Sequence, residues 1–258
     1  MGIKYMLAYP SPTSREEKMK MIRTVTDRLM DRYGEDIIAV GVYGSTAYQK
    51  EGRHSDIEMH VVTKDGVSIP VQEFIYGKFK LELSCREKSK LFERAARVDD
   101  SWSIWAGSFV NVLAIHDPEG IFEQLKSVPF QAKKESVREM MRTFMIWEPY
   151  ETMGKIRNNH ENGNFRYIQM GARDLAWQTA KLIGLANRAY YTTRARTFEE
   201  SLDLESKPSG YRELVEFLET GDIRDKETLY LLCENLWTGL NSWFDEMGID
   251  YKSHELPF

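Results

Sequence analysis

The chain has 258 residues, of which 42% are hydrophobic and 29% charged, values typical of one large or two ordinary globular domains. The net charge of −5 and the lack of a basic tract disfavour a nucleic-acid partner. The sequence shows no signal-peptide pattern and no apolar run near roughly 20 residues, which disfavours a membrane partner. We therefore expect a cytoplasmic protein without nucleic-acid or membrane partners, in which the distant Cys85 and Cys233 are buried thiols.

The first predicted element is an amphipathic helix. Ser14 and Glu17 stand at capping-box spacing, and apolar residues then recur at helical intervals, so we expect a helix from about residue 15 to 33. The mostly apolar run 36–45 follows and predicts a buried strand that ends at Gly44.

The next predicted strand, over residues 55–63, alternates between apolar and polar side chains. Residues i and i+2 of a strand share a face, so Asp56, Glu58 and His60 are expected on its polar face. Three further elements are expected in order: a hairpin turning at Gly77-Lys78, a strand over 108–117 and a short helix over 118–128.

From about residue 132 the pattern is helical to the end of the chain, interrupted by polar and glycine-rich loops at 158–164 and 205–210. We therefore expect an α+β fold of two domains. A mixed sheet with helices occupies residues 1–127, and a helical bundle occupies residues 128–258.

Acidic side chains interrupt the strands of the first half. Asp56 and Glu58 repel each other unless a cation or water lies between them, and Glu82, on a neighbouring predicted strand, could supply a third carboxylate. Such an oxygen-rich set suits Mg²⁺. A solvated sheet face is the alternative interpretation of the acidic doublet.

A glycine-serine pair ends the strand before this doublet. Gly44 would let the backbone approach a ligand closely, and free N–H groups at a helix start would suit a phosphate, with the Ser45 hydroxyl as a further donor.

This constellation resembles the DNA polymerase β-like nucleotidyltransferase superfamily, whose signature is a Gly-Ser turn, an Asp-x-Asp/Glu strand and a third strand carboxylate. Longer stretches are similar to the kanamycin nucleotidyltransferase family of aminoglycoside 4′-O-nucleotidyltransferases. The similar stretches run in the same order across nearly the whole chain: "GVYGS", "SDIEM", "GKFKLEL", "GKIRN", "YYTT", "PSGY" and "LPF".

The resemblance implies a metal-dependent nucleotidyltransferase. Such an enzyme transfers a nucleoside monophosphate from Mg-ATP, or another nucleoside triphosphate, to the 4′-hydroxyl of an aminoglycoside such as kanamycin or tobramycin. Pyrophosphate leaves and the antibiotic is inactivated, which confers resistance. Two metals bridged by carboxylates can activate the attacking hydroxyl and stabilise the leaving group.

The resemblance also implies roles for particular residues of the first half. Asp56, Glu58 and Glu82 match the catalytic carboxylates that bind Mg²⁺. Gly44 and Ser45 match the turn that binds the nucleotide phosphates.

In the second half, the resemblance implies that Glu151 is the general base and that Lys155 contacts nucleotide phosphate. Their i and i+4 spacing makes them neighbours on one helix face, where an exposed ion pair is the alternative interpretation. Pro149 lacks a backbone donor, so the helix is expected to kink or restart there, and Glu148 is the second candidate for the base. The resemblance further implies a homodimer with the active site at the interface.

The chain departs from the family at Tyr48, where the family carries an arginine; Lys50 and Arg53 are nearby cations that could compensate. We expect His60 to lie outside the metal shell or in solvent, because Mg²⁺ prefers oxygen ligands. Trp102 is the candidate for stacking on a base or sugar.

Two other functions remain open from the sequence. One is a nucleotidyltransferase that modifies a protein or an RNA, although the lack of basic tracts argues against RNA. The other is a catalytically silent nucleotide-binding module, although all the expected carboxylates are present.

Overall fold

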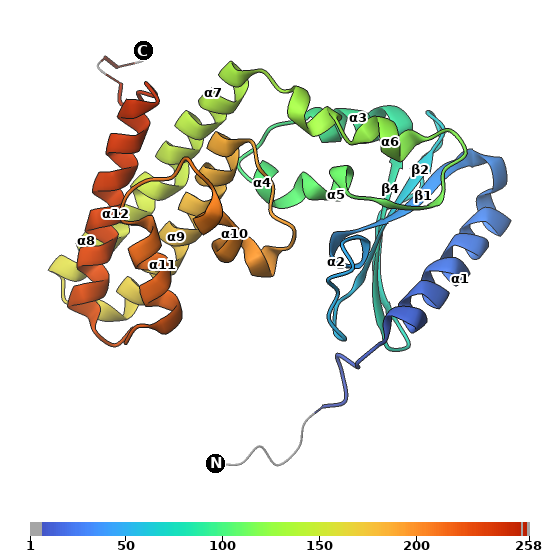
Figure 1. Cartoon of the computed structure of the whole chain (residues 1–258), viewed down its shortest axis with the longest axis horizontal. Coiled ribbons are helices and arrows are strands. Elements are labelled where there is room, and N and C mark those ends of the chain that lie inside the picture. The colour runs from blue at the N-terminus through green and yellow to red at the C-terminus, as the bar shows by residue number, and fades with distance from the viewer. Residues whose placement is uncertain (1–6, 254, 257–258) are drawn as a thin grey trace. The chain divides into compact units, whose positions relative to one another are not determined.

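The structure is a computed structural model that describes residues 7–253 and 255–256 (Figure 1). By their mutual contacts these residues form two compact units. The sheet unit comprises the residues up to Arg97 and Trp105–Gln131, and the helical unit comprises Val98–Ile104 and the residues from Ala132 onward. Contacts alone do not define independently folding domains, so the boundary between residues 127 and 128 stays a prediction.

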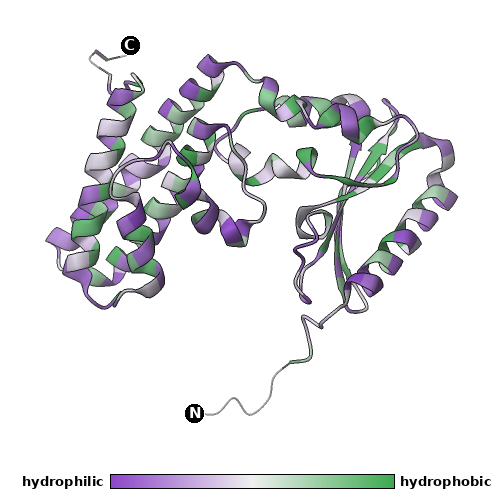
Figure 2. Cartoon of the chain, viewed as in Figure 1, coloured by the Kyte–Doolittle hydropathy of each residue, from purple (hydrophilic) through white to green (hydrophobic). Residues whose placement is uncertain are grey.

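A five-stranded mixed sheet forms the centre of the sheet unit. Its strand order is β3-β4-β2-β1-β5, in which β2 and β4 are parallel and the other neighbours are antiparallel. The strands are β1 (Ile37–Tyr43), β2 (Ile57–Thr63), β3 (Gln72–Tyr76), β4 (Phe79–Glu87) and β5 (Leu113–His116). In Figure 2 the strands carry both hydrophobic and hydrophilic residues, and the central strand β1 is buried at every position.

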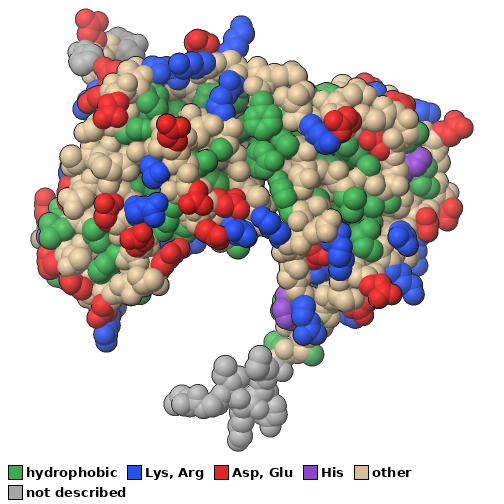
Figure 3. All heavy atoms as spheres, viewed as in Figure 1, with side chains coloured by type: hydrophobic (Ala, Val, Ile, Leu, Met, Phe, Trp, Pro, Cys, Tyr) green, Lys and Arg blue, Asp and Glu red, His purple; other side chains and the backbone are tan. Residues whose placement is uncertain are grey.

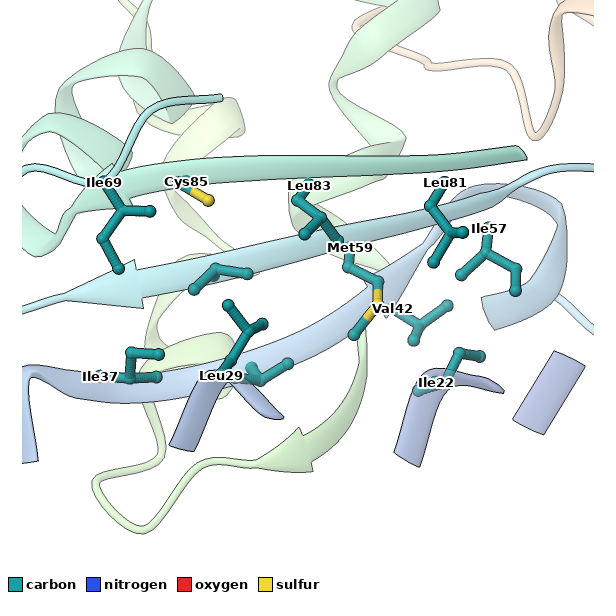
Figure 4. Close-up of a cluster of buried hydrophobic side chains, with 12 residues drawn as sticks. Ile22, Leu29, Ile37, Val42, Ile57, Met59, Ile69, Leu81, Leu83 and Cys85 are labelled. Carbon is teal, nitrogen blue, oxygen red and sulfur yellow. The ribbon is translucent and has the colours of Figure 1, made fainter. Parts of the chain in front are cut away.

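Helices cover both faces of this sheet. They are α1 (Arg15–Tyr33), α2 (Gly44–Ala47), α3 (Lys88–Ala96), α5 (Gly107–Val110) and α6 (Ile121–Leu125), with 3₁₀ turns at Gly34–Asp36 and Val128–Gln131. On one face, Ile22 and Leu29 of α1 pack with Ile57 and Met59 of β2 and with Leu81 of β4 (Figure 4). Burying each such side chain contributes about 1.5–3 kcal/mol.

The opposite face carries a second apolar cluster. Leu91 of α3, Phe109 of α5 and Phe122 of α6 pack there against Ala39 and Val62 of the sheet. Both faces of the central strands are therefore buried, and Glu58 is the one residue of β2 that is only partly buried.

The helical unit is organised around one long apolar helix, α9, which contacts five of its helices. The helices are α7 (Lys134–Met145), α8 (Glu151–Glu161), α9 (Phe165–Asn187), α10 (Thr197–Asp203), α11 (Tyr211–Thr220) and α12 (Lys226–Glu246), with a π-helical turn at Ile146–Tyr150 and a 3₁₀ turn at Arg194–Arg196. A short helix α4 (Trp102–Trp105) lies where the chain passes between the units. Among the described residues, no helix combines the length and apolarity that a bilayer crossing needs.

Two motifs of the helical unit serve its packing. In the YYTT motif, the Tyr191 hydroxyl donates to the Ala180 carbonyl at 2.6 Å. In the PSGY motif, Tyr211 is fully buried and its hydroxyl lies 2.7 Å from that of Ser201. Gly210 has φ +77° and lies so close to the backbone of Leu236 that a side chain would not fit.

Several local expectations are confirmed. The capping box of α1 is formed by Ser14 and Glu17, and the hairpin turns at Gly77, which has φ +58°. Both cysteines are free and buried. The strand expected over 108–117 is wrong in its first part, because Gly107–Val110 form a helical turn and only Leu113–His116 pair with β1.

Candidate active site

The turn after β1 is shaped by Gly44. Its φ of +65° is a conformation that L side chains rarely adopt, and a Cβ at this position would lie 1.8 Å from Oε2 of Glu58. Glycine is required here because the turn passes directly over the Glu58 carboxylate. Ser45, half-buried in the first turn of α2, lies beside this contact.

Strand pairing aligns three side chains in a row across the sheet. Tyr43 is the register partner of Glu58 in β1 and β2, and Glu58 is the register partner of Glu82 in β2 and β4. Directly paired residues share a face, so the three side chains lie on the same face of the sheet. The Tyr43 hydroxyl donates to Oε1 of Glu82 at 3.0 Å.

Glu58 has a perturbed acidity. Burial and the neighbouring carboxylates of Asp56 and Glu82 together raise its pKa to about 7, while Lys80 opposes the shift. The side chain thus lies in a partly desolvated, negative environment, and such perturbed carboxylates are concentrated at functional sites.

Asp56 lies one residue before β2 and is half-buried. Its Oδ2 is 3.1 Å from Nζ of Lys80, and the same ammonium lies 2.8 Å from Oε1 of Glu73. Hydrogen bonds to Glu73 and Asp56 raise the pKa of Lys80. The sequence interpretation missed this lysine, although its place two residues before Glu82 puts both on one strand face.

The donor set suits a hard divalent cation, since it offers only carboxylate oxygens. Burial, and after it repulsion from Asp56 and Glu82, raises the pKa of Glu58, and a bound cation would relieve that repulsion. Within the part of the chain that the structure describes, however, no three acidic, histidine or cysteine side chains are arranged closely enough to hold a metal ion. Asp56 is instead paired with Lys80. The assignment of Asp56, Glu58 and Glu82 as metal ligands therefore stays a prediction.

The loop between the Gly44 turn and β2 is fastened to the start of α1. Nζ of Lys18, a side chain only 1% exposed, donates to the Gly52 carbonyl at 2.7 Å. Arg15 forms an ion pair with Glu51 at 2.6 Å, and the Thr13 backbone N–H donates to the Arg53 carbonyl at 2.7 Å. Burial lowers the pKa of Lys18.

The role of Lys18 was also missed from the sequence. The sequence does contain an indication of it, because Lys18 is a cation that stands four residues before Ile22, on the apolar face of the helix. Because the loop that it fastens leads into Asp56, this lysine helps to place the first carboxylate of the site.

Two aromatic expectations need correction. His60 is only 2% exposed, so the option of a solvated residue is wrong, and its Nε2 lies 2.9 Å from the Ser108 carbonyl. Burial lowers the pKa of His60 to about 4, which keeps the imidazole neutral. Trp102 is only 3% exposed, so its ring is covered by protein and offers no open face for stacking.

Glu151 and Lys155 belong to the helical unit. The π-helical turn that contains Pro149 separates α7 from α8, and α8 starts at Glu151, which confirms the expected restart. Oε1 of Glu151 lies 2.6 Å from Nζ of Lys155, and both side chains are more than half exposed. Their hydrogen bond raises the pKa of Lys155. Glu148 accepts a hydrogen bond from Nε2 of Gln178 at 2.9 Å.

Comparison with known proteins identifies the family to which this chain belongs. Residues 119–250 match the family model of the KNTase C-terminal domain. An aminoglycoside nucleotidyltransferase (4′) from Staphylococcus aureus is 32% identical over 250 residues, which cover 96% of this chain and 99% of the relative. This chain belongs to the aminoglycoside 4′-nucleotidyltransferase family. A second aminoglycoside nucleotidyltransferase (4′), from Bacillus sp, is also 32% identical over 96% of this chain.

A solved structure supports the fold of this aminoglycoside 4′-nucleotidyltransferase family member. The crystal structure of a nucleotidyltransferase-like protein from Exiguobacterium sibiricum 255-15 superposes with a TM-score of 0.51, covering 90% of this chain and 81% of that one. At 12% identity the match shows the fold alone. The family resemblance is thus confirmed, and so is the mixed α/β part of the fold expectation.

Proposed function

We propose that this protein transfers a nucleoside monophosphate from Mg-ATP, or another nucleoside triphosphate, to the 4′-hydroxyl of aminoglycosides such as kanamycin or tobramycin. Pyrophosphate is released and the modified antibiotic no longer acts, which makes the protein a resistance enzyme. The observation that carries the proposal is the meeting of the Gly44 turn with Glu58, in register with Glu82.

In this proposal the predicted N-terminal domain, residues 1–127, holds the nucleotide. Asp56, Glu58 and Glu82 would bind Mg²⁺, which neutralises triphosphate charge when bound. The Gly44 turn leaves room for the phosphates, and the Ser45 hydroxyl donates to them.

The predicted C-terminal domain, residues 128–258, supplies the acid–base chemistry. Glu151 accepts the proton of the 4′-hydroxyl as its oxygen bonds to the α-phosphorus, and the bond from that phosphorus to the pyrophosphate oxygen breaks. Lys155 balances negative charge on the phosphates. Their ion pair keeps both groups on the solvent-exposed side of α8, within reach of a substrate.

We also propose a homodimer with the active site at the interface. Exposed aromatic side chains precede Glu151: Trp147 is 69% exposed and Tyr150 is 56% exposed. Large exposed aromatic groups are typical of surfaces that another protein covers. On the face in Figure 3, acidic and basic side chains are interspersed, which accords with small cationic substrates rather than a long polyanion.

The test is incubation of the protein with kanamycin and Mg²⁺ in parallel reactions with ATP, GTP, CTP and UTP. We expect pyrophosphate release and a mass increase of the antibiotic by one nucleoside monophosphate. An aminoglycoside without a 4′-hydroxyl is the matched control and should stay unmodified. Labelling of protein or RNA instead of antibiotic, or nucleotide binding without transfer, would contradict the proposal.

A further inference from the structure

Tyr43 belongs to the row of paired side chains across the sheet, and the family resemblance implies no role for it. It is the last residue of β1 and is only 8% exposed. Its hydroxyl passes over the β2 position of Glu58 and donates to Oε1 of Glu82, two strands away, at 3.0 Å. One tyrosine therefore spans the whole row of paired residues.

A second side chain holds this tyrosine in place. The Tyr43 ring stacks on the imidazole of His60, with 4.2 Å between ring centroids and 26° between planes. His60 in turn stacks on Phe109 at 5.3 Å and hydrogen-bonds the Ser108 carbonyl, both from α5. Because Nε2 must donate to that carbonyl, the imidazole carries its proton there, and Nδ1 has no partner in the described protein.

The Tyr43 hydroxyl has one polar contact among the described residues, the Glu82 carboxylate. A phenol carries its proton at neutral pH, so this hydroxyl acts as a donor to the carboxylate. A carboxylate that accepts a bond at one oxygen is fixed in rotation and still offers its other oxygen to a ligand.

We propose that Tyr43 is a positioning residue that orients the Glu82 carboxylate toward a divalent cation, and that the stack on His60 holds Tyr43 in place. This inference rests on the proposed function, because it assumes that Glu82 is a metal ligand. Partners that orient ligating carboxylates typically change metal affinity or activity by about 10–100-fold when they are removed.

The test is Tyr43→Phe, which keeps the stacking ring and removes the hydroxyl. Mn²⁺ is the probe, and its binding to the full chain is measured by electron paramagnetic resonance with a non-hydrolysable ATP analogue present. We expect about tenfold weaker Mn²⁺ binding and a matching rise in the Mg²⁺ concentration that gives half-maximal turnover. Saturating Mg²⁺ should restore most of kcat.

Tyr211→Phe is the matched control, because it removes another buried tyrosine hydroxyl, bonded to Ser201 in the helical unit. It should lower the thermal midpoint without changing Mn²⁺ affinity. If Tyr43→Phe likewise changes only the midpoint, the tyrosine has a structural role alone and the inference is overturned.

Variants of His60 test the stack separately. His60→Phe keeps a flat ring beside Tyr43 and should bind Mn²⁺ more tightly than His60→Ala, which removes the ring. Equal affinity of these two variants would overturn the role of the stack.

The inference and the proposed function fail in different ways. Wild-type protein that binds Mn²⁺ with nucleotide but modifies no aminoglycoside overturns the substrate while the Tyr43 comparison still holds. Wild-type protein that binds no Mn²⁺ overturns both the metal assignment and the inference.

Discussion

The carboxylate row of the sheet and the Glu151–Lys155 pair of α8 are built in different ways. Backbone pairing of two strands holds Glu58 opposite Glu82, in a partly desolvated environment. Glu151 and Lys155 instead meet through one exposed contact, a type of pair that contributes little to stability. The first arrangement is preorganised before any substrate arrives, whereas the second can re-form around a substrate at little cost.

The largest expected effect comes from the preorganised region. Asp56→Ala should lower kcat/KM by at least about a thousandfold, since a lost metal ligand removes charge stabilisation of the transition state. Folding should be retained, because the partly exposed pair with Lys80 contributes at most about 1 kcal/mol. Steady-state kinetics and thermal unfolding measure the two quantities.

Glu73→Ala is the matched control for that variant, because Glu73 is the other carboxylate bound by Lys80. It should leave turnover within a few-fold of wild type. Full turnover in Asp56→Ala would refute the metal assignment.

A smaller effect is expected in the exposed region. Glu151→Gln keeps the shape of the side chain but cannot accept a proton, so kcat should fall by about 10²–10⁴-fold. Binding of nucleotide and aminoglycoside, measured by calorimetry, should change little. Glu148→Gln serves as the comparison, and an unchanged kcat in Glu151→Gln with a loss in Glu148→Gln would transfer the base role to Glu148.

The smallest effect is on stability and concerns Glu58 without metal. Its pKa is raised from 4.5 to about 7, so folding favours the protonated form. This contribution is fully present below about pH 4.5 and is lost as the pH rises through about 7, a change on the order of 3 kcal/mol. Glu58→Gln lacks the titration, so without divalent cations it should become more stable than wild type toward pH 8.

Chemical denaturation of both proteins between pH 5 and pH 8, with a chelator present, measures this difference. Glu73→Gln, an exposed carboxamide variant on β3, controls for the change of charge. Stability curves for wild type and Glu58→Gln that run parallel over this range would show that folding does not raise the pKa of Glu58.

Local patterns predicted much of the fold and the site. The capping box of α1, the end of β1 at Gly44 and the hairpin at Gly77 depend on neighbouring residues, so short stretches of sequence specify them. The sequence also placed Glu82 on a strand neighbouring that of Glu58, which is confirmed, whereas the register that sets these two residues opposite each other comes from the structure.

Contacts between distant segments could not be predicted in this way. His60 has the alternation of an exposed residue, yet Phe109 and Phe122, about fifty residues later, cover it. The hydrogen bonds of Lys18 to Gly52 and of Tyr43 to Glu82 likewise join segments whose proximity depends on the assembled sheet. The neighbouring residues do not encode such contacts.

The π-helical turn Ile146–Tyr150 has a consequence for how this chain can vary in length. A turn of this kind accommodates one residue more than a regular α-helical turn. Deleting one residue there would convert it to an α-helical turn that completes the same rotation around the axis, so α7 would run smoothly into α8 and α8 would keep its direction. Glu151 and Lys155 would stay paired and face the same direction, so this segment should tolerate the loss of one residue better than a regular α-helical turn would.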